Sequence, residues 1–300
     1  MFRLSLVLAA ALCAASLALA SAQPSAARSA SFPVIIHAAN GDVVIKAKPT
    51  HIVSLSPTAT EDLFAIGAGR QVVAVDDQSD YPKQAPMTKL SGFRPNAEAI
   101  AAYNPDLVVV SNDGGIVASL QRLGITVLLE PAADTVAQAY DEIRQLGAAT
   151  DHVAAANTVV RGMQRKLTAL IRSVPKTKRH QRVFHELSPD YYSATSNTFI
   201  GRIYKLFGFK NIADAADSTH TGYPKLSAEY ILSADPQIVV LSDSVCCAQT
   251  AATVAARPGW QQVAAVKLHQ VVPVDDSVAS RWGPRIVDFA RVVAAVAKRG

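Results

Sequence analysis

Polar and aromatic side chains follow several of the strands that this sequence predicts. The candidates are Ser56, Phe93, Arg94, Asn112, Asp113 and Gly114 in the first half, and Tyr191, Tyr192, Tyr223, Asp275, Arg281 and Trp282 in the second. In open α/β sheets, ligands bind beyond the carboxyl ends of the strands. Single residues also have a structural interpretation, since Arg281 could simply pair with Asp275 or Asp276. As a group, they predict a cleft that holds a small molecule by aromatic packing and one or two charge-assisted hydrogen bonds.

Two glutamates occupy the same place in two copies of one short segment. NAEAIAAYNPDLVVVSND (96–113) contains Glu98, and SAEYILSADPQIVVLSDS (227–244) contains Glu229, at an offset of 229 − 98 = 131. Each glutamate is expected to stabilise the first turn of a helix, where the helix dipole favours an acid. The matched positions also allow a second interpretation, a pair of widely spaced contacts to a basic partner.

Catalytic and metal-binding motifs are absent from the sequence. It contains no GxSxG, HExxH, GxxxxGK[ST] or CxxC pattern, and its seven histidines are dispersed without ligand spacing. His185-Glu186 begins like the zinc helix, but Pro189 stands where the second histidine should be. The sequence therefore predicts a binding protein without cofactor or metal rather than an enzyme. An exported hydrolase or a sensor with an α/β fold stays open as an alternative.

The composition argues against nucleic-acid binding. The formal charge is 29 − 24 = +5, no basic run is long enough for a nucleic-acid patch, and only 6% of the residues are aromatic. Half of the residues are hydrophobic, which is enough for a sizeable core.

The first 22 residues are typical of a secretory signal peptide. Arg3 precedes the apolar run LSLVLAAALCAASLALA, and small residues near Ala20 form acceptable cleavage sites. Leu12 stands before Cys13, where a lipid attachment site would need a small residue, so a lipid anchor is not expected. We therefore predict an exported, periplasmic protein.

Cys246 and Cys247 are the only cysteines after the signal peptide, and they are adjacent. Export favours oxidation of thiols. A vicinal disulfide would be a strained eight-membered ring, because neighbouring Cα atoms lie ~3.8 Å apart, below the usual disulfide range. The alternatives are thiols that stay free or that pair with something else.

Strands alternate with helices in two regions, 33–150 and 180–300, and predict a parallel α/β lobe in each. Two β-rich runs flank Asn40-Gly41, the signature of a type I′ hairpin. Residues 52–55 form a buried-strand pattern, and Thr58 or Thr60 is expected to cap the helix that follows.

Residues 151–174 interrupt the alternation between strands and helices. Apolar residues recur there at helical spacing, Asp151 is a plausible N-cap, and Pro175 ends the pattern. The segment predicts one long helix of about 35 Å at 1.5 Å per residue. A helix of that length can brace two lobes.

Four segments together carry a resemblance to a known family. HIVSLSPTATEDLFAIGAGRQVVAVDDQSDYP, NAEAIAAYNPDLVVVSNDGG, SAEYILSADPQIVVLS and SRWGPRIVDFARVVAAV resemble the class III solute-binding proteins of ABC importers. The most similar branch is the cobalamin binders, with the iron-siderophore and haem binders close behind. The resemblance implies a monomer of two α/β lobes, joined by one long helix, with the ligand in the cleft between them. A divalent-metal binder of similar architecture is the nearest alternative.

The resemblance also implies roles for particular residues. Glu98 and Glu229 would contact arginines of a two-fold symmetric permease. Phe93 and Tyr192 match aromatic positions of the cleft, and the segment from Asp275 to Arg281 matches a loop that contributes an acid and an arginine. The loop Asn112-Asp113-Gly114 lacks a tryptophan found in relatives, and Arg94 adjoins Phe93. Those two departures favour an anionic ferric siderophore or haem over cobalamin.

Overall fold

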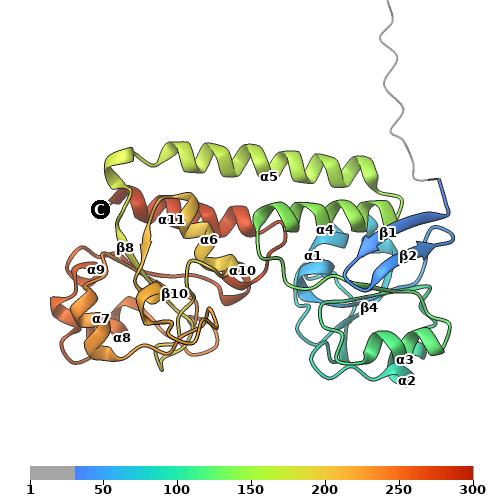
Figure 1. Ribbon diagram of the computed structural model, residues 1–300, viewed down its shortest axis with the longest axis horizontal. Coiled ribbons are helices and arrows are strands. Elements are labelled where there is room, and N and C mark those ends of the chain that lie inside the picture. The colour runs from blue at the N-terminus through green and yellow to red at the C-terminus, as the bar shows by residue number, and fades with distance from the viewer. Residues whose placement is uncertain (1–30, 300) are drawn as a thin grey trace, which may run out of the picture.

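Two parallel β-sheets form the centres of two lobes (Figure 1). The computed structural model describes residues 31–299, so the predicted signal peptide lies outside the described residues. The first sheet has the order β5-β4-β3-β6-β7 and the second β11-β10-β8-β9. The α/β fold predicted from the sequence is confirmed.

Most strands are buried on both faces, as parallel strands covered by helices must be. The first sheet consists of β3 (Ile52–Leu55), β4 (Val72–Asp76), β5 (Met87–Leu90), β6 (Leu107–Val110) and β7 (Val127–Leu129). The second consists of β8 (Arg182–Glu186), β9 (Lys210–Asn211), β10 (Ile238–Leu241) and β11 (Val271–Pro273). Every residue of β3, β6 and β10 is buried, which explains their continuous apolar sequences.

Helices cover the sheets on both sides. In the first lobe they are α1 (Pro57–Ala65), α2 (Ala97–Ala101), α3 (Ile116–Arg122) and α4 (Val136–Ala149). After α5 they are α6 (Phe199–Leu206), α7 (Ala228–Ala234), α8 (Ala251–Ala255), α9 (Ala264–Lys267), α10 (Asp276–Ser280) and α11 (Ile286–Arg299). Short 3-10 turns occur at Ala68–Gln71, Lys176–Lys178, Ile212–Ala216 and Trp260–Gln262. Within residues 31–299, none of these helices could span a bilayer.

Helix α5 (Val153–Ser173) runs along both lobes on one side of the molecule (Figure 1). It packs on α4 and α11, and a Cβ at Gly147 of α4 would collide with Ala156, so the crossing depends on this glycine. The predicted cap is wrong: Asp151 has φ 64°, and its carboxylate pairs with Lys48 at 3.4 Å. Because only residues 150–152 connect α4 to α5, the chain turns sharply there and α5 begins without a side-chain cap.

The duplicated segment folds in the same way in each lobe. Asn96 caps α2 and Ser227 caps α7, each by accepting a hydrogen bond from the amide three residues later. Each helix is followed by a left-handed residue before a proline, Asn104 (φ 49°) or Asp235 (φ 44°). The next strand, β6 or β10, then lies beside the first strand of its sheet.

Two local predictions need correction. Ser56, rather than Thr58 or Thr60, caps α1: its backbone is extended, and its hydroxyl accepts from Ala59 N at 3.3 Å. The hairpin of β1 (Val34–Ala38) and β2 (Gly41–Ile45) forms as predicted, but only Gly41 has a positive φ, so the turn is not type I′. The Asn40 side chain instead bonds Val127 O at 2.9 Å and Leu129 N at 3.0 Å, which fixes the hairpin to β7.

Candidate ligand cleft

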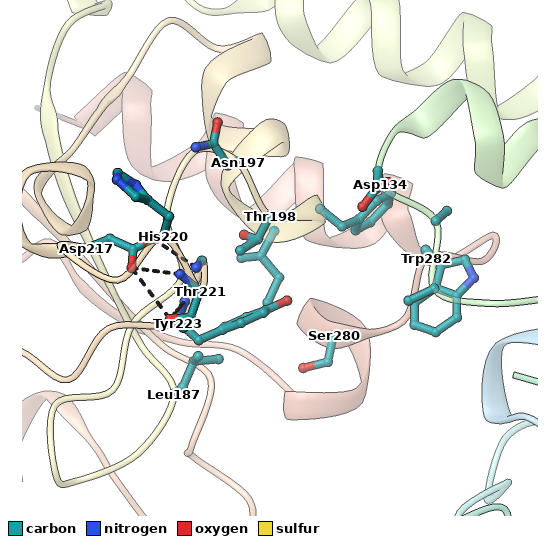
Figure 2. Close-up of a pocket in the computed structure, with 15 residues that line it drawn as sticks. Asp134, Leu187, Asn197, Thr198, Asp217, His220, Thr221, Tyr223, Ser280 and Trp282 are labelled. Carbon is teal, nitrogen blue, oxygen red and sulfur yellow. Dashed lines mark hydrogen bonds between the residues drawn. The ribbon is translucent and has the colours of Figure 1, made fainter. Parts of the chain in front are cut away.

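A cavity of about 410 Å³ lies between the two lobes (Figure 2). The first lobe contributes the loop 132–134, between β7 and α4. The second lobe contributes Leu187 after β8, the segment 197–200 at the start of α6, and the loop 217–223. Ser280 and Trp282 complete the wall. Its volume is in the range of small-molecule sites.

The loop 217–223 presents Tyr223 to this cavity. The carboxylate of Asp217 accepts hydrogen bonds from Thr221 N at 3.1 Å and Gly222 N at 2.8 Å, which closes the loop. Gly222 has φ 82°, and a Cβ there would lie 2.9 Å from Thr198 Cγ2. Tyr223 stays 48% exposed. Partial burial, together with the charge of Asp134 across the cleft, raises the pKa of its phenol.

A second cavity of about 440 Å³ lies at the carboxyl ends of β3, β4, β5 and β6 in the first lobe. Phe93 and Asn112 both line this cavity, as predicted from their positions after strands. Phe93 is 80% exposed, and the guanidinium of Arg94 lies 5.9 Å from its ring centroid. An aromatic ring exposed to that degree offers a face on which a ligand can pack.

Arg281 lies between the two cavities and links the lobes. Its guanidinium donates to Glu61 Oε1 at 2.9 Å, to Asp80 Oδ1 at 2.8 Å and to Gln78 O at 2.8 Å. The possible pairing with Asp275 or Asp276 is therefore wrong, because the partners come from the other lobe. Its hydrogen-bonding groups serve these contacts rather than the open cleft.

Glu61 is the centre of this cluster. Its buried carboxylate also accepts from Arg285 Nε at 2.9 Å and Nη2 at 2.6 Å. The guanidinium of Arg285 in turn lies 4.4 Å from the ring centroid of Tyr81. We call Glu61, Asp80, Arg281 and Arg285 the interlobe ion cluster.

Three further acids lie close to one another near the first cavity. Glu142 accepts a hydrogen bond of 2.8 Å from Trp282 Nε1. Burial raises the pKa of Glu130 to about 9 and that of Glu142 to about 7, each with an additional contribution from a neighbouring acid. Burial also raises the pKa of Asp62, followed by the charges of Glu142, Glu61 and Glu130. Gly283 passes close to Asp62, since a Cβ there would lie 3.1 Å from its Oδ1.

These raised pKa values predict that stability falls as pH rises. Glu130 and Glu142 ionise near pH 4.5 in the unfolded chain but near 9 and 7 when folded, so the folded chain holds more protons between those limits. The melting temperature should drop by on the order of 5–10 °C between pH 5.5 and 8.5. Differential scanning calorimetry measures it. The variant Glu130→Gln, Glu142→Gln should flatten the profile, and an unchanged slope would contradict the assignment.

Other predicted cleft residues have different partners. Asp113 Oδ1 accepts from Val117 N at 3.1 Å at the start of α3, and Gly114 lines a separate groove with Glu98. Asp275 caps α10 by accepting a hydrogen bond from Val278 N.

The two predicted tyrosines after β8 also have other partners. Tyr192 is 44% exposed beneath the ammonium of Lys225, which lies 5.7 Å from its ring centroid. Tyr191 instead stacks on buried Trp260 in the second lobe.

The adjacent cysteines do not form the vicinal disulfide considered from the sequence. Cys246 and Cys247 are free thiols, and both are exposed. The loop that carries them is held by its backbone, since the amides of Val245 and Cys246 donate to the carboxylate of Asp276. Among residues 31–299, no group of three or more His, Cys, Asp or Glu side chains is arranged to hold a metal ion.

Two residues of the site, Glu61 and Asp134, were not predicted from the sequence. Glu61 and Asp62 are adjacent acids in α1 that are followed at once by Leu63, and all three are buried. Two acids inside such a helix are a signal for buried ion pairing. Asp134 carries no comparable signal, because it is an ordinary loop residue until the second lobe brings Tyr223 near it.

Known proteins are similar to this chain in sequence and in architecture. The family model described as "Periplasmic binding protein" matches residues 52–278. The chain belongs to the periplasmic binding protein family. The two-lobed resemblance predicted from the sequence is thus confirmed.

Individual relatives within the family cover most of the chain. The uncharacterized ABC transporter substrate-binding lipoprotein YvrC of Bacillus subtilis is 32% identical, over 86% of this chain and 83% of its own. A cobalamin-binding protein of Halobacterium salinarum is 32% identical, over 87% of this chain and 73% of its own. The crystal structure of the vitamin B12 binding protein BtuF of Vibrio cholerae superposes with a TM-score of 0.68 at 26% identity, covering 83% of this chain and 96% of BtuF.

Proposed function

We propose that this chain is the exported binding component of an ABC importer and captures a corrinoid, a ferric siderophore or haem for delivery to the permease. The observation that carries the proposal is the cavity between the lobes, with Tyr223 and Trp282 on its wall and exposed Phe93 in the neighbouring cavity. Flat aromatic faces suit a large planar ligand. The proposal involves no covalent chemistry, and two relatives of the chain are named as binding proteins.

Export is part of the proposal. The N-terminal sequence is typical of a signal peptide, and the Bacillus relative is named as a lipoprotein. Delivery to a permease is supported by Glu98 and Glu229, which are both exposed and which occupy the same helical position in the two lobes.

Binding can be followed with the protein's own fluorescence. The sequence has two tryptophans, of which Trp260 is fully buried and Trp282 lines the cavity. Purified mature protein is titrated with cobalamin, haem, a ferric hydroxamate and a ferric catecholate, with zinc and manganese as controls. Saturable quenching by one of the four complexes is expected, and silence across all of them would refute the proposal.

Replacing Tyr223 by alanine should weaken that binding by roughly tenfold or more, about 1.4 kcal/mol, because the cavity loses its most exposed aromatic face. Tyr103→Ala is the matched control: Tyr103 is 37% exposed and follows α2 outside both cavities. Equal affinity of the two variants would remove Tyr223 from the site.

A further inference from the structure

One segment of the chain carries an excess of positive charge. Residues 153–179, which form α5 and the turn after it, contain seven lysines and arginines and no acid. Arg3 and Arg28 precede the described residues, so the rest of residues 31–299 holds 29 − 2 − 7 = 20 lysines and arginines against 24 acids. The small net charge of the chain therefore combines a basic segment with a remainder that is acidic.

The cations of α5 lie on the side of the helix that faces away from the protein. The buried side chains of α5 are those of Ala156, Val160, Met163 and Leu167. At about 100° per residue, Arg161, Arg165 and Arg172 fall within roughly 40° of one another on the opposite side. All three are exposed, as are the flanking Lys166 and Lys176, and α5 lies at the edge of the molecule (Figure 1). We call these five residues the basic face of α5.

The acids of the described chain do not neutralise the basic face. None of its five residues forms a salt bridge within residues 31–299. On α4 and α11, the helices that pack against α5, Asp141 pairs with Arg144 and Asp288 pairs with Arg291. The basic face therefore has its charge available to an anion outside the protein.

The chemistry of the basic face fits an array of phosphates. The exposed large hydrophobic side chains of residues 31–299 all lie outside α5, so this helix has nothing to insert into an apolar partner. The row from Arg161 to Arg172 spans about 16 Å along the helix, long enough to contact several phosphates at once. Guanidinium groups match the geometry of phosphate oxygens and bind them through two hydrogen bonds.

We propose that the basic face of α5 adsorbs to the anionic phospholipid surface of the membrane that holds the importer. The inference goes beyond the proposed function and takes from it only that the exported chain works beside a bilayer. Lysines and arginines near an anionic bilayer are attracted by its negative surface potential. Because the contact involves charge without apolar insertion, it is reversible and sensitive to salt.

Adsorption through α5 also orients the molecule. Helices α2 and α7 lie in the parts of the lobes away from α5 (Figure 1), so Glu98 and Glu229 then point away from the anionic headgroups. To bring these acids to a permease in the same membrane, the chain has to leave the lipid and turn over. The basic face thus keeps protein close to the importer and competes with docking.

Sedimentation with vesicles tests this proposal. Purified mature protein is mixed with vesicles of phosphatidylcholine, with or without phosphatidylglycerol, at about 50 mM and about 500 mM salt, a range over which the Debye length falls roughly threefold. At low salt, binding to the anionic vesicles should be roughly tenfold stronger or more than to the neutral ones, and high salt should abolish it. Equal binding to both vesicles, or binding that survives high salt, would overturn the inference.

Removing the charge of the basic face should remove the preference for anionic vesicles. The variant Arg161→Gln, Arg165→Gln, Lys166→Gln, Arg172→Gln should bind them roughly tenfold more weakly or less, and α5 should still form because Gln has a similar helix propensity.

The matched control removes four exposed cations beside β2 and on β5, α3 and α9: Lys46→Gln, Lys89→Gln, Arg122→Gln and Lys267→Gln. It should bind anionic vesicles nearly as well as the unchanged protein. An equal loss in both variants would show that net charge, rather than α5, governs adsorption, and would refute the assignment.

Two comparisons separate this inference from its rivals. If the protein ignores both vesicles but is retained by heparin through the same four residues, the partner is an anionic polymer and the lipid assignment is wrong. Vesicle binding as expected, with silence across the ligand panel, would refute the proposed function and leave the basic face as a lipid contact. Ligand binding without vesicle binding would do the reverse.

Discussion

Reversing the two acids proposed to contact the permease, Glu98→Arg and Glu229→Arg, will abolish ligand uptake in cells and leave the ligand affinity of the purified protein unchanged. Both side chains are exposed at the second position of a helix, in lobes that α5 holds together. Neither glutamate lines the two candidate ligand cavities, so ligand capture should not depend on them. Two arginines facing basic permease contacts would replace attraction with repulsion at both ends.

The matched control reverses two exposed acids elsewhere, Asp42→Arg and Asp141→Arg, on the β1–β2 hairpin and on α4. This control variant changes the net charge by the same amount as Glu98→Arg, Glu229→Arg does, but away from α2 and α7, so uptake should persist. Radiolabelled ligand uptake in a strain lacking the native chain measures both variants. Normal uptake by the Glu98→Arg, Glu229→Arg protein would refute the docking assignment.

Replacing Glu61 by alanine will destabilise the protein by about 3–5 kcal/mol, because it leaves two arginines of low exposure without their shared anion. The Arg281 and Arg285 side chains are 11% and 13% exposed. Urea unfolding of the purified protein measures the loss. The variant should also loosen the contact between the lobes, since Glu61 and Arg281 come from different lobes.

Asp80→Asn provides the contrast. Asp80 binds the same guanidinium, but its side chain is 62% exposed, so the loss should stay within about 1 kcal/mol. Similar costs for Glu61→Ala and Asp80→Asn would show that burial does not set the strength of this cluster.

Local patterns in the sequence predicted most of the fold. Helix α5 and strands β3, β6 and β10 follow from apolar spacing or continuous apolar runs, which depend on neighbouring residues only. Helix α4 was missed, although Thr135 and Gln138 form a capping box at its start and could have identified it. Its sequence carries several charged and polar residues, so the apolar pattern is weaker.

The candidate site was predictable only in part, because its contacts are distant in sequence. Phe93 and Asn112 line a cavity, as expected of residues after strands. Tyr223 and Trp282 also line a cavity, but Tyr223 lies in the loop before α7 and Trp282 follows α10, so neither comes directly after a strand. Arg281, by contrast, bonds Glu61 across 220 positions, a partner that no local spacing could identify. The capping role of Asp275 was equally hidden, since one acid after a strand can serve a helix or a ligand.

Helices α2 and α7 lie in the parts of the two lobes away from α5 (Figure 1). If the lobes rotated relative to each other about α5, Glu98 and Glu229 would lie on the helices far from the axis of that rotation. A small change of angle between the lobes changes the distance between the two carboxylates more than it changes any distance near that axis. A permease that contacted both glutamates, as proposed, would therefore sense the angle between the lobes from the separation of the two carboxylates, without any contact to the ligand.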